Sequence, residues 1–91
     1  MSSDIRALGE DLRRLLESLT DFTPDEVREV EQFLRAGEYG VAFETLCGII
    51  KEEGILISDL ARPAIRALAQ RMEIDPEWWA EICQVKTKDI R

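Results

Sequence analysis

The sequence predicts an all-α fold, a small bundle of four helices followed by a short C-terminal helix. Apolar residues recur at spacings of three and four along most of the chain, which is the period of one face of an α-helix. The pairs Thr23-Pro24 and Asp75-Pro76 each place a capping residue before a proline, a pattern typical of helix starts. Glycine, proline and alternating β-branched residues are too sparse for a sheet protein.

Ninety-one residues are enough for one domain and too few for two separate cores. We therefore expect a single helical domain over residues 1–91, with residues 84–91 as a polar, frayed tail. No apolar run approaches the ~20 residues that span a bilayer, and no signal peptide precedes the first helix. These features predict a cytoplasmic protein that does not associate with membranes.

The first helix is expected over residues 4–19, with Ser3 as its N-cap. Leucines dominate one side of it, and charged residues occupy the other side. We expect the apolar side to pack against the centre of the bundle. It consists of Ile5, Leu8, Leu12, Leu15, Leu16 and Leu19.

The second helix is expected to begin at Pro24 and to end near Ala36. Thr23 and Glu26 have the spacing of a capping box, in which each side chain accepts a hydrogen bond from the backbone N–H of the other residue. Proline fits the first helical position because its missing N–H has no partner to lose there. Apolar residues of this helix should face inward, namely Val27, Val30, Phe33 and Leu34.

The central helix of the bundle is expected over residues 38–53. Gly37 and Gly54 lie where glycine ends a helix in the left-handed conformation. Tyr39, near the start, should be partly buried at the turn. The middle of this helix leaves little polar surface, which is why we expect the other helices to pack around it. Its apolar positions are Ala42, Phe43, Leu46, Cys47, Ile49 and Ile50.

A short apolar connector, residues 55–57, should tuck under the bundle and lead to a fourth helix capped by Ser58 or Asp59. If Ser58 is the cap, Pro63 falls at the fifth helical position, where it would remove a backbone hydrogen bond and kink or loosen the first turn. The inner side of this helix is expected to contain Leu60, Ala61, Ala64, Ile65, Leu68, Ala69 and Met72.

The last helix is expected over residues 76–83. Trp78 and Trp79 are roughly 100° apart on it, so both rings cannot face the core equally. One tryptophan would then anchor the helix to the bundle, while the other is a candidate exposed hot spot for a partner. The alternative, in which both rings are half-buried at the edge of the bundle, is equally compatible with the sequence.

The stretch from Glu31 to Ser58 contains a recognisable set of residues, and a weaker set continues to Trp79. These positions are Phe33, Gly37, Glu38, Tyr39, Gly40, Ala42, Leu46, Cys47, Ile55, Ile57 and Ser58, followed by Leu68, Met72, Ile74, Asp75, Pro76, Glu77, Trp78 and Trp79. Through them, residues 27–80 resemble the MafI-type immunity proteins of bacteria. The resemblance implies a small helical protein that binds and neutralises a toxin made by the same cell or its kin, and it identifies no contact residue.

The net charge of −7 lies almost entirely in the first half of the chain, since residues 1–45 carry eleven acids and five bases. Such a field attracts a basic partner and repels phosphate backbones and anionic lipid. A solvated face that keeps the protein soluble is the simpler explanation of the same charge. Our candidate partner-binding residues are Asp25, Glu26, Glu29 and Glu31 together with Trp78 and Trp79.

The side chains available do not favour catalysis. The chain has no histidine, so it lacks a Ser-His or Cys-His nucleophile and a histidine base. No phosphate-binding glycine loop and no calcium-loop spacing is present, and Cys47 and Cys83 lack the spacing of a zinc site. We therefore expect no enzyme activity, no cofactor and no metal. Cys47 should be a buried apolar residue, and a Cys47–Cys83 disulfide stays open.

We expect an immunity protein that blocks a basic toxin, such as a nuclease, by occupancy, and that exists as a monomer or a weak homodimer. Two other classes remain. The domain could be a self-associating adaptor that uses an exposed tryptophan and the apolar connector. Residues 67–82 also resemble the helix-turn-helix of Xre-type repressors, but Glu73 stands where glycine is usual in the turn. The second helix of that unit has no basic or amide side chain to read bases, so we expect no binding to nucleic acid.

Overall fold

The computed structural model describes residues 2–83, and their side chains from residue 7 onward. This part of the chain is all-α, with five helices and no strand. The tail expected at residues 84–91 lies outside the described residues. The helices are α1 (Ser2–Ser18), α2 (Pro24–Arg35), α3 (Tyr39–Glu53), α4 (Ala61–Met72) and α5 (Pro76–Cys83).

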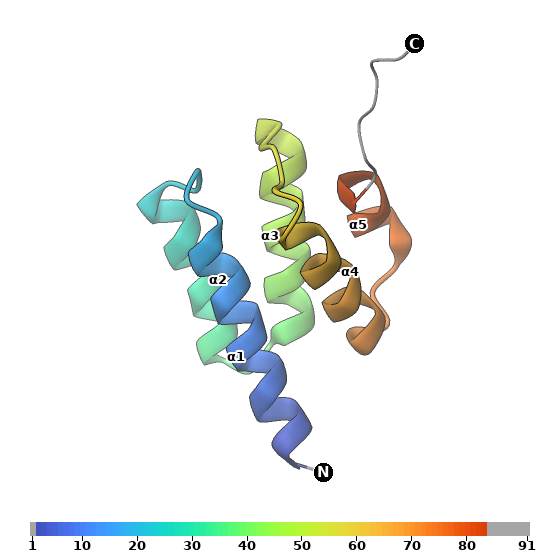
Figure 1. Cartoon of the computed structure of the whole chain (residues 1–91). Coiled ribbons are helices and arrows are strands. Elements are labelled where there is room, and N and C mark those ends of the chain that lie inside the picture. Colours follow the sequence, from blue (N-terminus) through green and yellow to red (C-terminus); the bar gives the residue numbers. More distant parts are fainter. Residues whose placement is uncertain (1, 84–91) are drawn as a thin grey trace.

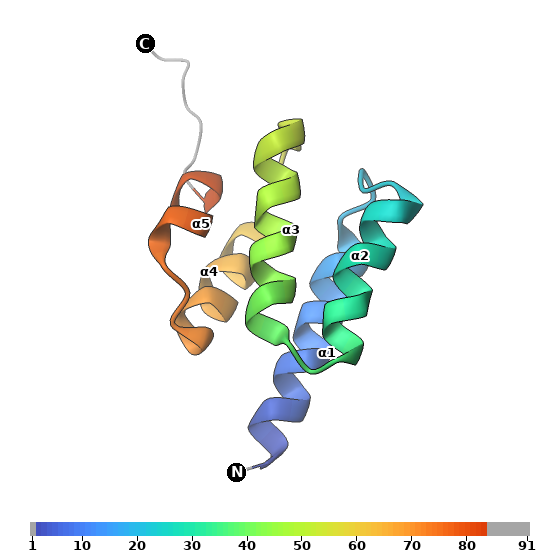
Figure 2. The same ribbon diagram turned by 180° about the vertical axis from the view of Figure 1, so that it is seen from behind.

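The helices form two layers. α2, α3 and α5 lie side by side in one layer, with α3 in the middle, as the view in Figure 2 shows. α1 and α4 form the other layer and lie in front of it in Figure 1, where the chain enters along α1 at the bottom of the view. The first helix therefore contacts α2, α3 and α4, while α5 packs against α3 and α4.

The helix α3 is central, as its sequence predicts. Ala42, Phe43, Leu46 and Cys47 have no exposed surface at all. They belong to one continuous apolar core to which every helix contributes. α3 borders three of the other four helices, so its buried side has no room for a polar group.

Most helix ends also follow their sequence signals. The Thr23 side chain accepts a hydrogen bond from the Glu26 N–H (3.2 Å), and the Glu26 carboxylate accepts one from the Thr23 N–H (2.9 Å), which completes the capping box. Gly37 and Gly54 both adopt left-handed conformations, with φ of 77° and 64°. α1 differs slightly from the expectation, since it begins at Ser2 and Ser3 therefore lies within the helix.

The start of α4 differs more. Ser58 caps the turn through its hydroxyl, which accepts a hydrogen bond from the Ala61 N–H (3.1 Å), but the helix itself begins only at Ala61. Pro63 thus falls in the first turn, where backbone N–H groups have no partner within the helix, and the expected kink is not required. Leu60 is expected on the inner side, yet it is 88% exposed, and Ala64 is exposed as well. Both expectations are wrong because the late start turns the first residues outward.

One buried position and one close contact are not apparent from the helical periodicity. Phe22 lies in the α1–α2 connection and is 7% exposed, and it occupies the position just before the cap, where an apolar residue often fixes the entry of the chain into a helix. Gly9 lies beneath the ring of Tyr39, because a Cβ atom there would be only 2.9 Å from the phenolic oxygen. Tyr39 is half-buried, as expected, but its partner is α1 in the other layer.

Candidate partner-binding face

The outward side of α2 carries mixed charge. Its exposed side chains include Asp25 and Glu29, but also Arg28 and Arg35. Asp25 forms an ion pair with Arg28 one turn further along the helix. This side of α2 is therefore close to neutral, and it presents no uniform acidic stripe.

Glu31, one of the predicted contact residues, is poorly available to a partner. Its side chain is 29% exposed and lies between two arginines, 3.8 Å from the Arg13 guanidinium and 3.9 Å from that of Arg35. The pair with Arg13 joins α2 to α1. Glu31 thus contributes to packing between helices, and a partner would have to displace these arginines to reach it.

The excess of negative charge lies at one end of the bundle. The end of α1, the start of α2 and the end of α3 meet there, at the top of Figure 1. Residues 17–29 and 51–53, which we call the acidic end, carry seven acidic and two basic side chains, a net charge of −5. The other 66 of the described residues 2–83 together have a net charge of −4, so the acidic end has the higher density of negative charge. The acidic members are Glu17, Asp21, Asp25, Glu26, Glu29, Glu52 and Glu53.

Two carboxyl groups of the acidic end are in direct contact. Glu26 and Glu53 come from α2 and α3, and their carboxyl groups form a hydrogen bond when one of them holds a proton. This hydrogen bond lowers the pKa of Glu26, which also accepts from the Thr23 N–H, and it raises the pKa of Glu53. Glu53 therefore takes up a proton first as the pH falls. The sequence gives no signal for this pair, since the two residues are 27 positions apart.

The two tryptophans of α5 have different surroundings. Trp79 is half-buried against the core, and its indole N–H donates to the Ile74 carbonyl oxygen (3.0 Å). Trp78 is 37% exposed and lies over α3, where a Cβ atom on Gly48 would be 3.9 Å from its ring. Trp79 therefore anchors α5, and Trp78 is the tryptophan that a partner can reach more easily.

The acids and Trp78 belong to the same layer of helices. α2 and α5 lie on either side of α3, so they are separated by two helix–helix spacings, about 20 Å. A protein partner that buries about 800 Å² of this surface would reach both. Lys51 holds the layer together at this point, because its ammonium group donates to the Glu77 carbonyl oxygen of α5 (2.9 Å).

The α4–α5 unit has a turn of the helix-turn-helix kind. Glu73 ends α4 in the left-handed conformation, with φ of 56°, at the position where glycine is usual. Asp75 then caps α5 by accepting from the Glu77 N–H (2.9 Å). α5 bears Glu77 and Glu81 and no basic residue, which opposes contact with phosphates. The unit is better suited to packing than to reading DNA.

Both cysteines are free thiols in the core. Cys47 has no exposed surface, and burial raises its pKa to about 12. Cys83 is also buried, and burial raises its pKa too. Thiolate is the reactive form, so these side chains act as apolar packing residues at neutral pH.

These observations define the class of the protein as a small all-α domain with a strongly acidic end. Among residues 2–83, no cluster of three or more Cys, Asp or Glu side chains is arranged to hold a metal ion. No helix of the described region has both the length and the apolarity to cross a membrane. Comparison of the chain with protein-family models, with curated proteins and with solved structures gives no match.

Proposed function

We propose that this protein is an immunity protein that binds a basic bacterial toxin and blocks it by occupancy. The observation that carries the proposal is the acidic end, which holds −5 of the net charge of −9 of residues 2–83 in only 16 residues. Charge concentrated in one region speeds the encounter with a basic protein and orients it. The resemblance of residues 27–80 to MafI-type immunity proteins supports the same function.

The acidic end and Trp78 would have different roles in this complex. Exposed carboxylates act mainly on the rate of association, because their field reaches beyond contact distance. An exposed tryptophan next to a glycine offers a flat apolar surface that a partner can cover, which mainly lengthens the lifetime of the complex. Trp79 has no direct role in binding, since its ring and its N–H are already used within the fold.

The test needs the partner itself, and for an immunity protein we expect a basic toxic domain to be encoded beside its gene. Co-expression of the protein with that domain should restore growth of the host cell, and the two purified proteins should form a complex. Growth arrest that persists despite abundant folded protein would refute the proposal.

The contribution of the acidic end is measured by charge reversal. Asp21→Lys with Glu52→Lys changes two exposed residues that have no capping role, whereas Glu10→Lys with Glu38→Lys makes the same change in net charge outside the acidic end. We expect the first double variant to associate about ten-fold more slowly at low salt, and the second to be much less affected. Equal slowing by both variants would show that only net charge matters. A Trp78→Ala variant should raise the dissociation rate and leave association nearly unchanged.

A further inference from the structure

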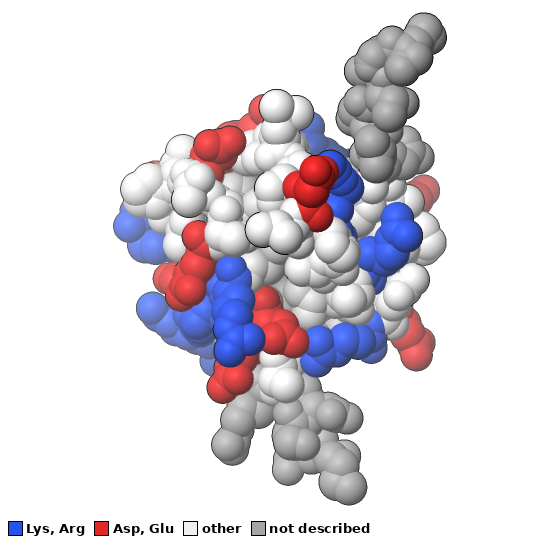
Figure 3. All heavy atoms as spheres, in the orientation of Figure 1, with Lys and Arg blue, Asp and Glu red and all other residues white. Residues whose placement is uncertain are grey.

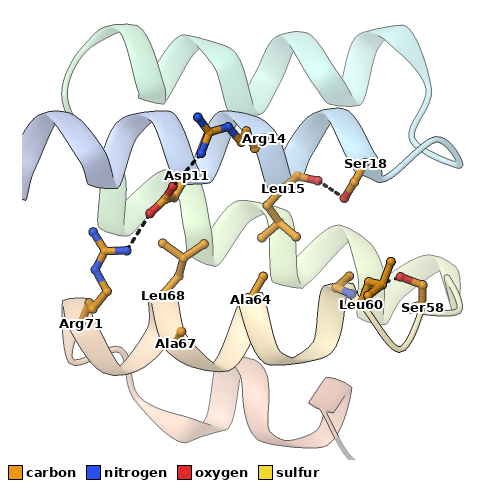
Figure 4. Close-up of a pocket in the computed structure, with 11 residues that line it drawn as sticks. Asp11, Arg14, Leu15, Ser18, Ser58, Leu60, Ala64, Ala67, Leu68 and Arg71 are labelled. Carbon is orange, nitrogen blue, oxygen red and sulfur yellow. Dashed lines mark hydrogen bonds and ion pairs between the residues drawn. The ribbon is translucent and has the colours of Figure 1, made fainter.

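The opposite face of the bundle contains an apolar groove between α1 and α4. It has a volume of about 380 Å³. Figure 4 shows Leu15 of α1 and Leu68 of α4 pointing toward each other across its floor, with Ala64 beside them. Figure 3 shows the same region as a largely uncharged area in the middle of this face. The groove is thus unlike the acidic end in both chemistry and position.

The exposed residues along α4 make this groove accessible to another helix. Leu60, Ala64, Ala67 and Arg71 follow one another at spacings of four, three and four, so they form a single stripe on the helix. The two alanines let a second helix approach closely, and Leu60, which is 88% exposed, projects from the end of the stripe. A side chain of this kind contributes little to its own fold when it lies in water.

The groove offers little to orient a small polar ligand. Its two serine hydroxyls already take part in local hydrogen bonds, because Ser18 donates to the Leu15 carbonyl oxygen (2.7 Å) and Ser58 accepts from the Ala61 N–H (3.1 Å). Most of the other lining side chains are Leu and Ala. Small-molecule sites depend on a few free polar groups for their specificity. A protein helix fits this surface better.

The charges at the two ends of the groove indicate which helix binds there. At one end, Arg71 pairs with Asp11 (2.8 Å), which also binds Arg14, so this end carries one excess positive charge. At the other end lies Asp59, whose carboxylate is 94% exposed, while its partner Arg62 is only 19% exposed. The outermost charge there is negative. The charges of the groove therefore match those of a second copy that lies antiparallel to the first, because the positive end of each copy then faces the negative end of the other.

We propose that the α1–α4 groove binds a second copy of this chain in a two-fold symmetric dimer. With the axis at the middle of the stripe, Ala64 of one protomer faces Ala67 of its partner, and Leu60 enters the partner's groove. Asp59 then lies next to Arg71 of the partner, a contact that the symmetry makes twice. A patch of a tenth of the surface, usual for small proteins, is about 600 Å² of the 5981 Å² available. Counted over both protomers this is about 1,200 Å², the lower limit for stable interfaces. We therefore expect a weak dimer, with a Kd on the order of 10–100 μM.

Sedimentation over a range of concentrations tests the dimer. The unmodified full chain should show a monomer–dimer equilibrium, and Ala67→Glu should weaken it at least ten-fold, because a charge would be buried at the symmetry axis. Gln70→Glu adds the same charge to the same helix outside the groove and should leave the equilibrium unchanged. A chain that stays monomeric at several times the expected Kd, or equal effects of both variants, would overturn the proposal.

A charge swap tests the antiparallel arrangement itself. Asp59→Arg alone would place two arginines together, and Arg71→Glu alone would place two carboxylates together, so each variant should dimerise less well than the unmodified chain. In a mixture, the arginine at position 59 faces the glutamate at position 71, and both contacts of the mixed dimer are attractive. We expect the mixture to associate at least ten-fold more tightly than either variant alone. A mixture no tighter than its components would exclude this arrangement.

Discussion

The two broad faces of the bundle differ in what their helices leave exposed. The α2–α3–α5 layer presents charged side chains, a strongly acidic end and the edge of one tryptophan. The α1–α4 groove presents alanines and a leucine, with charges only at its two ends. Both faces cover the same core, which is centred on α3.

The core alone does not require this difference. Within α4, the residues Ala61, Ile65, Leu68 and Ala69 are buried and satisfy the packing of the helix. The exposed stripe of the same helix could be polar without loss to the core, as the outward side of α2 is. Apolar residues that the core does not use are a feature of interaction surfaces. In our proposals, the acidic end steers a partner by its charge and the α1–α4 groove makes close contact with a second helix.

The largest expected effect is the difference in stability between substituting a leucine inside the core and substituting one outside it. Leu46→Ala removes a side chain with no exposed surface and should destabilise the protein by about 2–5 kcal/mol. Leu60→Ala is the same substitution at a position that is 88% exposed, and it should change the free energy of unfolding of the monomer by less than about 0.5 kcal/mol. Urea unfolding at low protein concentration measures both.

A large loss of stability in Leu60→Ala would contradict the view that the two faces of the bundle have different roles. Leu60 would then serve the fold of its own chain, and its exposure would need no partner to explain it. A small loss in stability combined with weaker self-association would instead show that Leu60 contributes to the dimer contact and not to the fold of its own chain.

A smaller effect is expected at the turn that joins α4 to α5. Glu73 adopts a left-handed conformation with φ of 56°, which costs a residue with a side chain about 1–2 kcal/mol and costs glycine much less. Glu73→Gly should therefore stabilise the protein by about 1 kcal/mol, less the entropy that glycine adds to the unfolded chain. Thermal unfolding checks this, with Glu77→Gly in the first turn of α5 as a control that should destabilise.

The sequence predicts the elements of the fold closely and the exposed side of one helix poorly. The capping box at Thr23, the glycine ends of two helices and the central position of α3 follow from local chemistry, and all are confirmed. The start of α4 could not be located in this way. Ser58 and Asp59 are both favoured as helix caps, whereas the helix begins after Leu60, a residue that has no capping side chain.

The candidate site depends on contacts between helices, which the spacing of apolar residues in the sequence does not predict. The predicted acids are close in sequence, but Glu31 is held between arginines from two helices, and Arg28 and Arg35 offset the outward charge of α2. The acidic end also includes Glu52 and Glu53, which approach α2 only because α3 runs back past it. The pattern thus indicates the sign of the surface charge, and the packing of the helices determines its position.

The smallest expected effect concerns the pair of carboxyl groups at the acidic end. Glu53→Gln keeps a side chain of the same size beside Glu26 but removes the group that ionises. The pKa of Glu53 is raised by its hydrogen bond to Glu26, so its contribution to stability is present below its ordinary pKa and is lost as the pH rises through the folded-state value. The variant avoids this loss and should gain stability relative to the unmodified protein between pH 4 and pH 7. Glu52→Gln, on the same turn, removes one charge without that hydrogen bond and should gain less.

Urea unfolding at pH 4 and at pH 7 measures the gain in stability. The rate of association with the proposed toxin shows whether the same substitution affects binding. A variant that is more stable at pH 7 but associates more slowly at low salt would show that the acidic end is kept at a cost in stability. No difference between Glu53→Gln and Glu52→Gln in unfolding would exclude the contact between Glu26 and Glu53. Because both side chains are exposed, the gain should shrink as salt is added, whereas an effect of packing alone would not change.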